Sequence, residues 1–277
     1  MRIAFISDVH ANLEALEAAL GRIRELDVDR VVCLGDLVGY NADPDACVAR
    51  LRAQGVTCIA GNHDQAAAGL FEPVQFGQRG RRVILWTRRH ASHETLAYLK
   101  ELPVFVRLTD ESCAVHAALH PEPNTRYHLT RPERVAASFE RLCVDPEEAR
   151  ICFFGHTHRP VVWERDSAGM RQRLGAPEGT VELRPDAWYL INPGTIGQPR
   201  ENDQRAAFAV WDQARALVHF ERVEYDWRSA ERKAEAAGLL AEPPLLERSM
   251  MYLTNQLDTG RELVGRVVRR GRAALSG

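Results

Sequence analysis

The sequence predicts an α/β fold in which two β-sheets pack as a sandwich with helices on its outer faces. Over residues 1–60, short apolar runs alternate with helical segments, which is the pattern of parallel strands joined by helices. From residue 160 onward the expected elements are mostly short strands, with glycine and proline in the turns between them. We therefore expect a chain that begins as α/β and continues mostly as β-structure.

The order of the elements follows from apolar periodicity and from residues that begin or end helices. Asn12 is a suitable N-cap for a helix whose leucines recur at helical spacing. Asp43 and Pro44 are expected to begin a second helix, and Pro103 to end a long helix over 79–101. A further helix is expected over 132–142. The expected strands are 3–6, 31–34, 56–60, 104–108, 113–115, 151–154, 160–165, 180–184, 188–191, 206–212 and 216–222.

Composition narrows the class of protein. The 277 residues include 36 basic and 38 acidic side chains, so the formal net charge of -2 gives no electrostatic basis for binding nucleic acid or a membrane surface. None of the six cysteines forms a C-x-x-C pair, which is typical of buried, reduced thiols. The N-terminus lacks the apolar core of a signal peptide, and no apolar run approaches the ~18 residues that span a bilayer. We expect a cytoplasmic protein with no membrane partner.

The chain is expected to divide near residue 225. Residues 1–225 form one domain in this interpretation, and residues 226–277 form a helical extension that packs on this domain or on a partner subunit. Pro243 and Pro244 interrupt the helical pattern of the extension. Within 261–273, arginines are interspersed with valines, as in an amphipathic helix with one solvated face. Homo-oligomer formation through this extension is left open.

Residue types that bind metal ions follow five of the expected strands. In an open α/β sheet, ligands bind beyond the carboxyl ends of the strands, so these side chains converge if the strands share a sheet. Aspartate and histidine together suit divalent ions such as Mn, Fe, Ni or Zn. Two ions held ~3.5–4 Å apart need a bridging carboxylate and can act on both oxygens of an in-line displacement. The blocks are Asp8-Val9-His10, Gly35-Asp36, Gly61-Asn62-His63-Asp64, His116 and Gly155-His156-Thr157-His158.

In this order, the five blocks resemble the pattern of the calcineurin-like metallophosphoesterase superfamily, which reads D-x-H, G-D, G-N-H-D/E, a single His and G-H-x-H. The resemblance implies the metallophosphoesterase fold, in which two sheets lie between two layers of helices. It also implies a metal-dependent phosphoric ester hydrolase that uses a metal-bridging hydroxide as nucleophile. The cofactors implied are two divalent metal ions, with manganese favoured and iron, nickel or zinc as alternatives.

The resemblance also implies a role for each matching residue. His63 lies outside the metal shell and is expected to be catalytic, close to the scissile oxygen. In phosphoprotein phosphatases a carboxylate orients this histidine from the third position after the bridging aspartate. That position is Gly39 here, which leaves Asp64 as the nearest carboxylate. The implied metal ligands are Asp8, His10 and His158 for one ion, Asn62, His116 and His156 for the other, and Asp36 as the bridge.

Substrate preference depends on cations near the metal site. Phosphoprotein phosphatases have an arginine shortly after the second block and another after the third, whereas residues 37–41 and 64–66 contain none here. We therefore expect a preference for diesters, which carry less charge than monoesters. Residues 192–200 resemble a block of the small bacterial phosphodiesterases and make Arg200 a candidate substrate-binding residue. Asn62 is expected to contact substrate as well, and His120 or His128 lies in a loop that follows His116.

Two other functions remain as alternatives. One is a phosphomonoesterase or protein phosphatase of the same superfamily, which a comparison of monoester and bis-ester substrates would distinguish. The other is a non-catalytic scaffold of the same fold, like the retromer-type relatives, although scaffolds lose metal ligands and none is missing here. The expected partner is a small phosphate ester. Nucleic acid is expected only as a small nucleotide, because the extra DNA-binding domains of the related nucleases are not seen.

Overall fold

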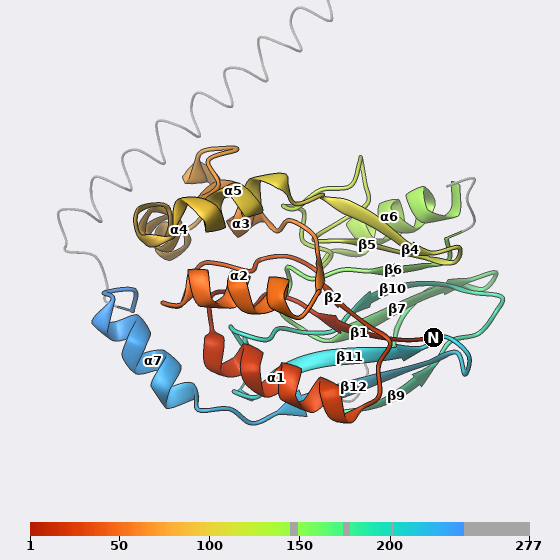
Figure 1. Cartoon of the computed structure of the whole chain (residues 1–277). Helices are drawn as coiled ribbons and strands as arrows, with labels where there is room; N and C mark the ends of the chain where they lie inside the picture. The colour runs from red at the N-terminus through yellow and green to blue at the C-terminus, as the bar shows by residue number, and fades with distance from the viewer. Residues whose placement is uncertain (145–148, 174–177, 201, 241–277) are drawn as a thin grey trace, which may run out of the picture.

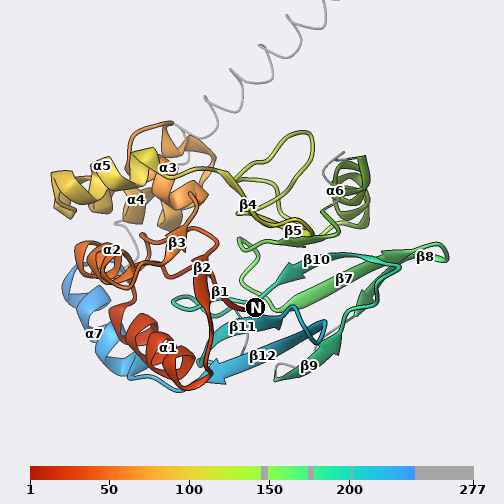
Figure 2. The same ribbon diagram turned by 45° about the vertical axis from the view of Figure 1, so that its right-hand side comes forward.

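Two mixed β-sheets pack face to face in the computed structural model, and helices cover both outer faces (Figures 1 and 2). The structure describes residues 1–144, 149–173, 178–200 and 202–240. Over this part of the chain, the architecture confirms the expected α/β sandwich and the helix–sheet–sheet–helix layering of the metallophosphoesterase fold.

The first sheet contains the N-terminal strands. Its strand order is β3-β2-β1-β11-β12-β9. The strands β1, β2 and β3 run parallel, while β11 pairs antiparallel with β1 on the other side. The carboxyl ends of the three parallel strands therefore lie at one edge of the sheet. The strand bounds are β1 (Arg2–Ile6), β2 (Arg30–Cys33), β3 (Thr57–Cys58), β9 (Gly179–Glu182), β11 (Ala206–Asp212) and β12 (Leu217–Val223).

The second sheet is built from the middle of the chain. Its strand order is β4-β5-β6-β10-β7-β8, with β5, β6 and β10 parallel and the remaining pairs antiparallel. The bounds are β4 (Phe105–Thr109), β5 (Ser112–Val115), β6 (Ile151–Phe153), β7 (Val161–Asp166), β8 (Gly169–Arg173) and β10 (Trp188–Asn192). Sequence analysis missed β8, because its side chains are mostly polar and exposed at the sheet edge and so provide no apolar run.

The helices agree with expectation except in two places. Residues 79–101 form two helices instead of one, because Ser92 interrupts the run and caps the second helix by accepting a hydrogen bond from the amide of Thr95 at 3.1 Å. The short helix α3 was not expected, since it lies within a metal-binding block. The bounds are α1 (Leu13–Glu25), α2 (Pro44–Ala53), α3 (Asn62–Ala67), α4 (Gln78–His90), α5 (His93–Glu101), α6 (Pro132–Val144) and α7 (Trp227–Ala236), with a 3₁₀ turn at Pro73–Gln75.

Side-chain alternation along the strands builds three apolar layers. In β1, Ala4 and Ile6 pack outward against α1 and α2, whereas Ile3 and Phe5 point inward between the sheets. The ring of Phe5 stacks on that of Phe153 from β6, with centroids 3.6 Å apart. The outer face of the second sheet packs under α6. These layers fix the two sheets relative to one another, and the site depends on that placement.

The C-terminal part of the described chain returns to the first helix layer. Helix α7 packs beside α1 (Figure 1), and Lys233 forms ion pairs with Glu14 at 2.6 Å and Asp43 at 2.8 Å. Residues 241–277, including the expected amphipathic stretch at 261–273, lie outside the described residues, so the division of the chain at residue 225 remains a prediction. Among the described helices, none combines the length and the apolar character that crossing a membrane requires.

Candidate metal centre

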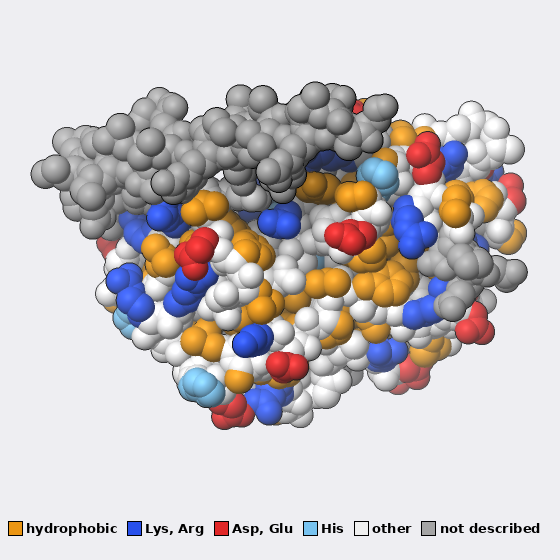
Figure 3. Space-filling model, turned by 90° about the horizontal axis from the view of Figure 1, so that it is seen from above, with side chains coloured by type: hydrophobic (Ala, Val, Ile, Leu, Met, Phe, Trp, Pro, Cys, Tyr) orange, Lys and Arg blue, Asp and Glu red, His pale blue; other side chains and the backbone are white. Residues whose placement is uncertain are grey.

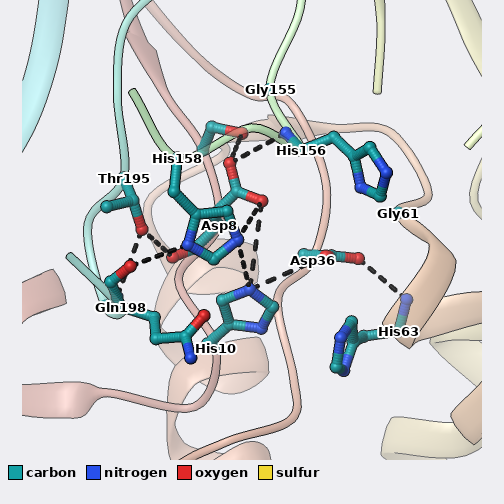
Figure 4. A network of polar contacts seen from close by, with 12 residues as sticks. Asp8, His10, Asp36, Gly61, His63, Gly155, His156, His158, Thr195 and Gln198 are labelled. Atoms are coloured by element: carbon teal, nitrogen blue, oxygen red, sulfur yellow. Dashed lines mark hydrogen bonds and ion pairs between the residues drawn. The ribbon is translucent and has the colours of Figure 1, made fainter. Parts of the chain in front are cut away.

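The predicted metal ligands come together at one edge of the sandwich, immediately beyond the carboxyl ends of β1, β2, β3, β5 and β6. Figure 4 shows Asp8, His10, Asp36, His156 and His158 from this cluster. The expectation that they converge was conditional on a shared sheet, and the structure shows that the cluster is shared between the two sheets. The first sheet contributes four of the seven side chains and the second contributes three. All seven have exposed fractions of 7 % or less. They are Asp8, His10, Asp36 and Asn62 from the first sheet, and His116, His156 and His158 from the second.

One group of ligand atoms consists of Asp8, His10 and His158. Asp8 Oδ1 lies 3.2 Å from His158 Nε2, and the Nε2 atoms of the two histidines are also 3.2 Å apart. The other oxygen of Asp8 accepts hydrogen bonds from Ser7 Oγ at 2.7 Å and from the His156 amide at 3.1 Å. Asp8 Oδ1 itself is buried without a hydrogen-bond partner. This free oxygen and the two imidazoles face one another, as Figure 4 shows.

A second group consists of Asp36, His116 and His156, with Asn62 beside it. The amide atom of Asn62 that faces this group lies 3.0 Å from His156 Nδ1 and 3.2 Å from Asp36 Oδ2. If this atom is the amide oxygen, it faces other hydrogen-bond acceptors and forms no hydrogen bond with Asp36. In a metal-free protein, an amide nitrogen at this position would donate hydrogen bonds to these acceptors. With a cation present, the amide oxygen at this position would be a metal ligand beside them. We prefer the oxygen orientation because the donor set around it is one that binds divalent ions.

Asp36 lies between the two groups. Its Oδ2 atom is 3.7 Å from His10 Nε2 and 3.4 Å from His116 Nε2, while its Oδ1 atom accepts a hydrogen bond from the His63 amide at 2.8 Å. Oδ2 is therefore the oxygen of Asp36 that faces both groups of ligand atoms. The backbone of Gly61 passes so close that an added Cβ would lie 2.0 Å from Asp36 Oδ1. Only glycine at position 61 allows this approach.

Backbone carbonyls fix the orientation of three histidines. The Nδ1–H groups donate to Val38 O from His10 at 3.1 Å, to Leu34 O from His116 at 2.7 Å, and to Gln198 O from His158 at 2.7 Å. Because a carbonyl only accepts, each Nδ1 carries a proton, which leaves each Nε2 as the atom that faces the cluster. Metal-binding histidines are commonly oriented in this way. The donor set, the unpartnered Asp8 oxygen and these tautomers together fit two divalent cations.

The electrostatics of the cluster also suit cations. Burial opposes ionisation of Asp8 and Asp36, but the neighbouring histidines outweigh it and hold the pKa of both carboxyls below the usual range. Burial lowers the pKa of His10 and His156 well below 6.5, so both are neutral. Burial also opposes the charged form of His116, yet Asp36 beside it raises the pKa of that imidazole to about 9. A metal ion bound there displaces this proton.

Most of the ligands have a left-handed backbone, which L-residues adopt at a cost of about 1–2 kcal/mol each. Strain of this kind is characteristic of functional sites, where the surrounding structure holds the residue in place. It explains how strand ends turn sharply enough to direct their side chains toward a common point. The φ angles are 53° for Asp8, 50° for His10, 54° for Asp36, 65° for His156 and 60° for His158.

His63 lies beside the metal ligands, and aromatic rings surround it. The centroid of the His63 ring lies 4.8 Å from that of His10, 4.8 Å from that of Tyr40 and 5.0 Å from that of Phe76. The rings of His10 and Tyr40 also contact each other, with centroids 4.7 Å apart. Burial lowers the pKa of His63 to about 4. Its Nδ1 atom is buried without a hydrogen-bond partner. Among the described residues, no carboxylate contacts Nδ1, so the ring is oriented by packing against its aromatic neighbours.

Asp64 does not orient His63. Its two carboxylate oxygens accept hydrogen bonds from the backbone amides of Val38 at 3.1 Å and Gly61 at 2.9 Å. The carboxylate thus ties the loop after β2 to the start of α3, which carries Asn62 and His63. Gly39 lies against His63, since an added Cβ would be 2.5 Å from Nδ1. The space next to this nitrogen is closed by backbone.

The turn at residues 192–200 forms hydrogen bonds with the backbone segments that carry Asp8, His156 and His158. Asn192 Nδ2 donates to Gly155 O at 2.6 Å and to Thr157 Oγ1 at 3.0 Å. Thr195 Oγ1 donates to Asp8 O at 3.0 Å, and the carbonyl of Gln198 accepts from His158. The turn therefore joins the end of β1 to the end of β6, and with them the two sheets. The turn is a structural corner, and through Gln198 it also contacts His158 directly.

A cavity of about 220 Å³ opens over the cluster. Arg200 lines it, as does His128, whose ring lies 4.0 Å from that of His156. His120 is exposed and does not line the cavity. Sequence analysis missed Arg126, Tyr40 and Phe76, because no strand end or motif marks them. The full lining is Asp36, Tyr40, Asn62, His63, Gln75, Phe76, Gly77, Arg126, His128, His156, His158 and Arg200.

The fold and this cluster define a metallophosphoesterase, and comparison with known proteins agrees. The chain belongs to the calcineurin-like phosphoesterase superfamily, whose domain model matches residues 1–215. The crystal structure of a metallophosphoesterase from Sphaerobacter thermophilus is similar with a TM-score of 0.71 and 33 % identity, covering 86 % of this chain and 95 % of that chain. The uncharacterized protein MJ0912 of Methanocaldococcus jannaschii is 34 % identical over 235 residues, which are 83 % of this chain and 90 % of the relative.

A third comparison concerns the fold alone. The hypothetical protein PH1004 of Pyrococcus horikoshii superposes with a TM-score of 0.69 at 20 % identity, covering 86 % of this chain and 94 % of that chain. Two sheets and their helices are thus retained where most side chains differ.

Proposed function

We propose that this protein is a dinuclear phosphodiesterase, with manganese as the favoured metal. The observation that carries the proposal is the position of Asp36 Oδ2, which lies between two groups of buried ligand atoms at 3.7 Å from one imidazole nitrogen and 3.4 Å from another. A single metal ion would leave one of these groups without a cation. The non-catalytic alternative is disfavoured because the ligand set is complete on both sides.

The expected ligands divide into two sets, one for each metal ion. Asp8, His10 and His158 would hold one ion, Asn62, His116 and His156 would hold the other, and Asp36 would contact both. When bound, the ions supply a nucleophile from water near neutral pH and neutralise charge on the phosphoryl oxygens. Asn62 is also expected to contact substrate, since it lines the cavity.

His63 acts on the leaving oxygen in this proposal. It lines the cavity beside Asp36, and its Nδ1 atom faces the backbone of Gly39, so Nε2 is the nitrogen that remains for substrate. Because burial lowers the pKa of His63 to about 4, the ring is neutral near neutral pH and its Nε2–H donates a hydrogen bond to the leaving oxygen as the ester bond breaks. The aromatic rings that pack around His63 restrict its rotation, so the direction in which Nε2 points is fixed.

The preference for diesters rests on where the fixed cations lie. Arg126 and Arg200 are exposed at the mouth of the cavity, while the ligand atoms on its floor are buried. A phosphate on the floor is therefore held mainly by the metal ions and by neutral groups. A diester carries one negative charge and requires less compensation than a dianionic monoester. The second candidate is a phosphomonoesterase. Arg126 and Arg200 line the same cavity, and their positive charges would help to balance the second negative charge of a monoester.

A substrate panel tests the proposal. The metal-free protein is loaded in turn with Mn, Ni, Fe, Zn and Mg, and kcat/KM is measured on bis-p-nitrophenyl phosphate and p-nitrophenyl phosphate. We expect metal-dependent hydrolysis, highest with Mn, and a higher kcat/KM for the bis-ester. A clearly higher value for the monoester at saturating metal would assign the chain to the phosphomonoesterases. No hydrolysis with any ion would refute the enzymatic proposal.

A further inference from the structure

Two cationic side chains stand at the mouth of the metal cavity and are not needed to hold the ions. Arg126 comes from the loop between β5 and α6, and Arg200 comes from the end of the 192–200 turn. Both side chains are exposed, whereas the ligands on the floor of the cavity are buried. A molecule bound at the floor would therefore meet these arginines with its outer part.

Local hydrogen bonds hold the loop that carries Arg126. The side-chain oxygen of Asn124 accepts from the amides of Arg126 at 3.2 Å and Tyr127 at 3.0 Å, and its Nδ2 donates to Ala118 O at 3.1 Å. These bonds close the loop on itself in the manner of an Asx turn. The backbone at Arg126 is therefore ordered before any ligand binds.

The same loop is tied to the helix that begins at the metal site. Thr125 Oγ1 donates to Gln65 Oε1 of α3 at 2.7 Å. The guanidinium of Arg126 lies over the ring of Phe71, 5.1 Å from its centroid, and Phe71 stacks near Phe76, which lines the cavity. The cation is thus supported by an aromatic face, which leaves its hydrogen-bond donors available.

The charge of the cavity lining differs from the charge pattern on the face of the molecule seen in Figure 3. On the face seen in Figure 3, basic and acidic side chains are mixed, in agreement with the near balance of 36 basic and 38 acidic residues. Among the described residues that line the cavity, the acidic one is Asp36 on the floor, and Arg126 and Arg200 provide two positive charges at the mouth. No described carboxylate forms an ion pair with either guanidinium. The mouth is therefore set to receive an anion.

We propose that Arg126 and Arg200 form a subsite for a second anionic group of the substrate, separate from the phosphate that is hydrolysed. This inference rests on the proposed phosphodiesterase function. The substrate class is a phosphodiester that carries a further phosphate on one of its alcohol substituents, such as a nucleotide diester with a terminal phosphate. Guanidinium groups match phosphate oxygens in pairs of parallel hydrogen bonds. Tyr40 and Phe76 line the same cavity and add apolar ring surface between the floor and the two arginines.

Two substrates that differ by one phosphate test this subsite. Thymidine 5′-(p-nitrophenyl phosphate) and its 3′-phosphorylated analogue share the scissile bond and the leaving group. We expect wild-type protein to have a higher kcat/KM for the 3′-phosphorylated compound. Arg126→Gln and Arg200→Gln should each reduce this advantage by about tenfold or more, mainly through KM, because a charge-assisted hydrogen bond is lost. Arg126→Lys should retain part of the advantage, since the charge remains and the paired geometry does not.

Arg131→Gln is the matched control, because Arg131 is exposed at the far end of the same loop and does not line the cavity. It should leave the ratio of the two substrates unchanged. Equal losses for both substrates in the Arg126 and Arg200 variants would overturn the subsite and assign these arginines to the scissile phosphate. Unchanged ratios in both variants would overturn it as well.

A binding measurement separates this inference from the proposed function. Calorimetry on Mn-loaded protein should show tighter binding of thymidine 3′,5′-bisphosphate than of thymidine 5′-monophosphate, and the difference should disappear in Arg126→Gln and Arg200→Gln. Equal affinities in wild-type protein would contradict the subsite, whatever the activity. A wild-type protein that distinguishes the two ligands but hydrolyses neither diester would refute the proposed function and leave the anion subsite in place.

Discussion

The position of His63 depends on the shape of its surroundings. Its Nδ1 atom has no hydrogen-bond partner, and the carboxylate of Asp64 is already engaged by two backbone amides. The ring is instead held between Tyr40, Phe76 and the backbone of Gly39. Packing of this kind restricts rotation without adding charge, so the site keeps an orienting device although the carboxylate of the phosphoprotein phosphatases is absent.

Gly39→Ala tests this packing. A Cβ at position 39 would lie 2.5 Å from His63 Nδ1, so the ring must move. We expect kcat/KM to fall on the order of 10²-fold, because small displacements of a reacting group have effects of this size. Gly55→Ala is the control: Gly55 also has a positive φ, of 63°, but an added Cβ meets nothing within 4 Å. Equal activity in the two variants would show that the packing against His63 is unimportant.

His63→Ala separates catalysis from metal binding. Since His63 is not among the expected ligands, the variant should bind the same number of ions as wild type, measured by elemental analysis. Its activity should fall most for esters with a strongly basic leaving oxygen, because such a group needs a proton as the bond breaks. A uniform loss across leaving groups, or a loss of bound metal, would contradict the catalytic role.

At the scale of residues, the motif blocks were sufficient to predict which side chains gather, but not how they are held. Asp8, Asp36 and His158 follow strands in the sequence, and the structure brings them together with the other predicted ligands. Arg126 was not predictable, because it follows no strand and belongs to no recognised block. Its place at the cavity depends on the loop closed by Asn124, and a single Asn in a polar loop has many other roles.

At the scale of elements, the turn at residues 192–200 connects the two halves of the site. It contacts the end of β1 through Thr195 and the end of β6 through Asn192. The carbonyl of Gln198 accepts the Nδ1 proton of His158 and so presents the opposite nitrogen to the cluster. The carbonyl of Gln198 therefore determines which nitrogen of His158 faces the cluster.

Asn192→Ala should weaken both the fold and the metal site. Asn192 is fully buried and its side chain donates two hydrogen bonds, so the free energy of unfolding of the metal-free protein should fall by about 1–3 kcal/mol. Loss of support behind a ligand should also lower metal affinity by about 10–100-fold. Urea unfolding and a metal titration measure the two effects. Unchanged metal affinity in a destabilised variant would limit the turn to a structural role.

The elements themselves were predictable where apolar periodicity is strong. The helix capped by Asn12 and the strands around Phe5 and Phe153 are examples, since their buried faces repeat at helical or strand spacing. The break at Ser92 was not predicted, because residues 79–101 were assigned to one helix although serine favours helix N-caps. The exposed strand β8 was also missed, as edge strands lack the alternation on which such predictions depend.

At the scale of the whole molecule, the metal cluster joins two sheets that otherwise meet through their apolar faces. The stacked rings of Phe5 and Phe153 represent that apolar contact. Asp36 comes from the first sheet and His116 from the second, so an ion bound by both adds a link between the sheets. Binding of metal is therefore coupled to the stability of the sandwich.

Removal of metal should lower the stability of the fold. At a free ion concentration of about 100 times Kd, one bound ion adds about 2.7 kcal/mol to the free energy of unfolding. We therefore expect a chelator to lower Tm by several degrees and added Mn to restore it. His63→Ala should respond in the same way as wild type. A Tm that is insensitive to chelator and to added metal would contradict binding of ions between the sheets.

The most direct test of the account is the number of metal ions in active protein, with and without the Asp36 carboxylate. Elemental analysis of active wild-type protein should give two divalent ions per chain. Asp36→Asn should bind fewer ions and lose most of its activity, because a neutral amide is a poor bridge between two cations. One ion or none in fully active wild-type protein would contradict the account, as would an Asp36→Asn variant that keeps both the ions and the activity.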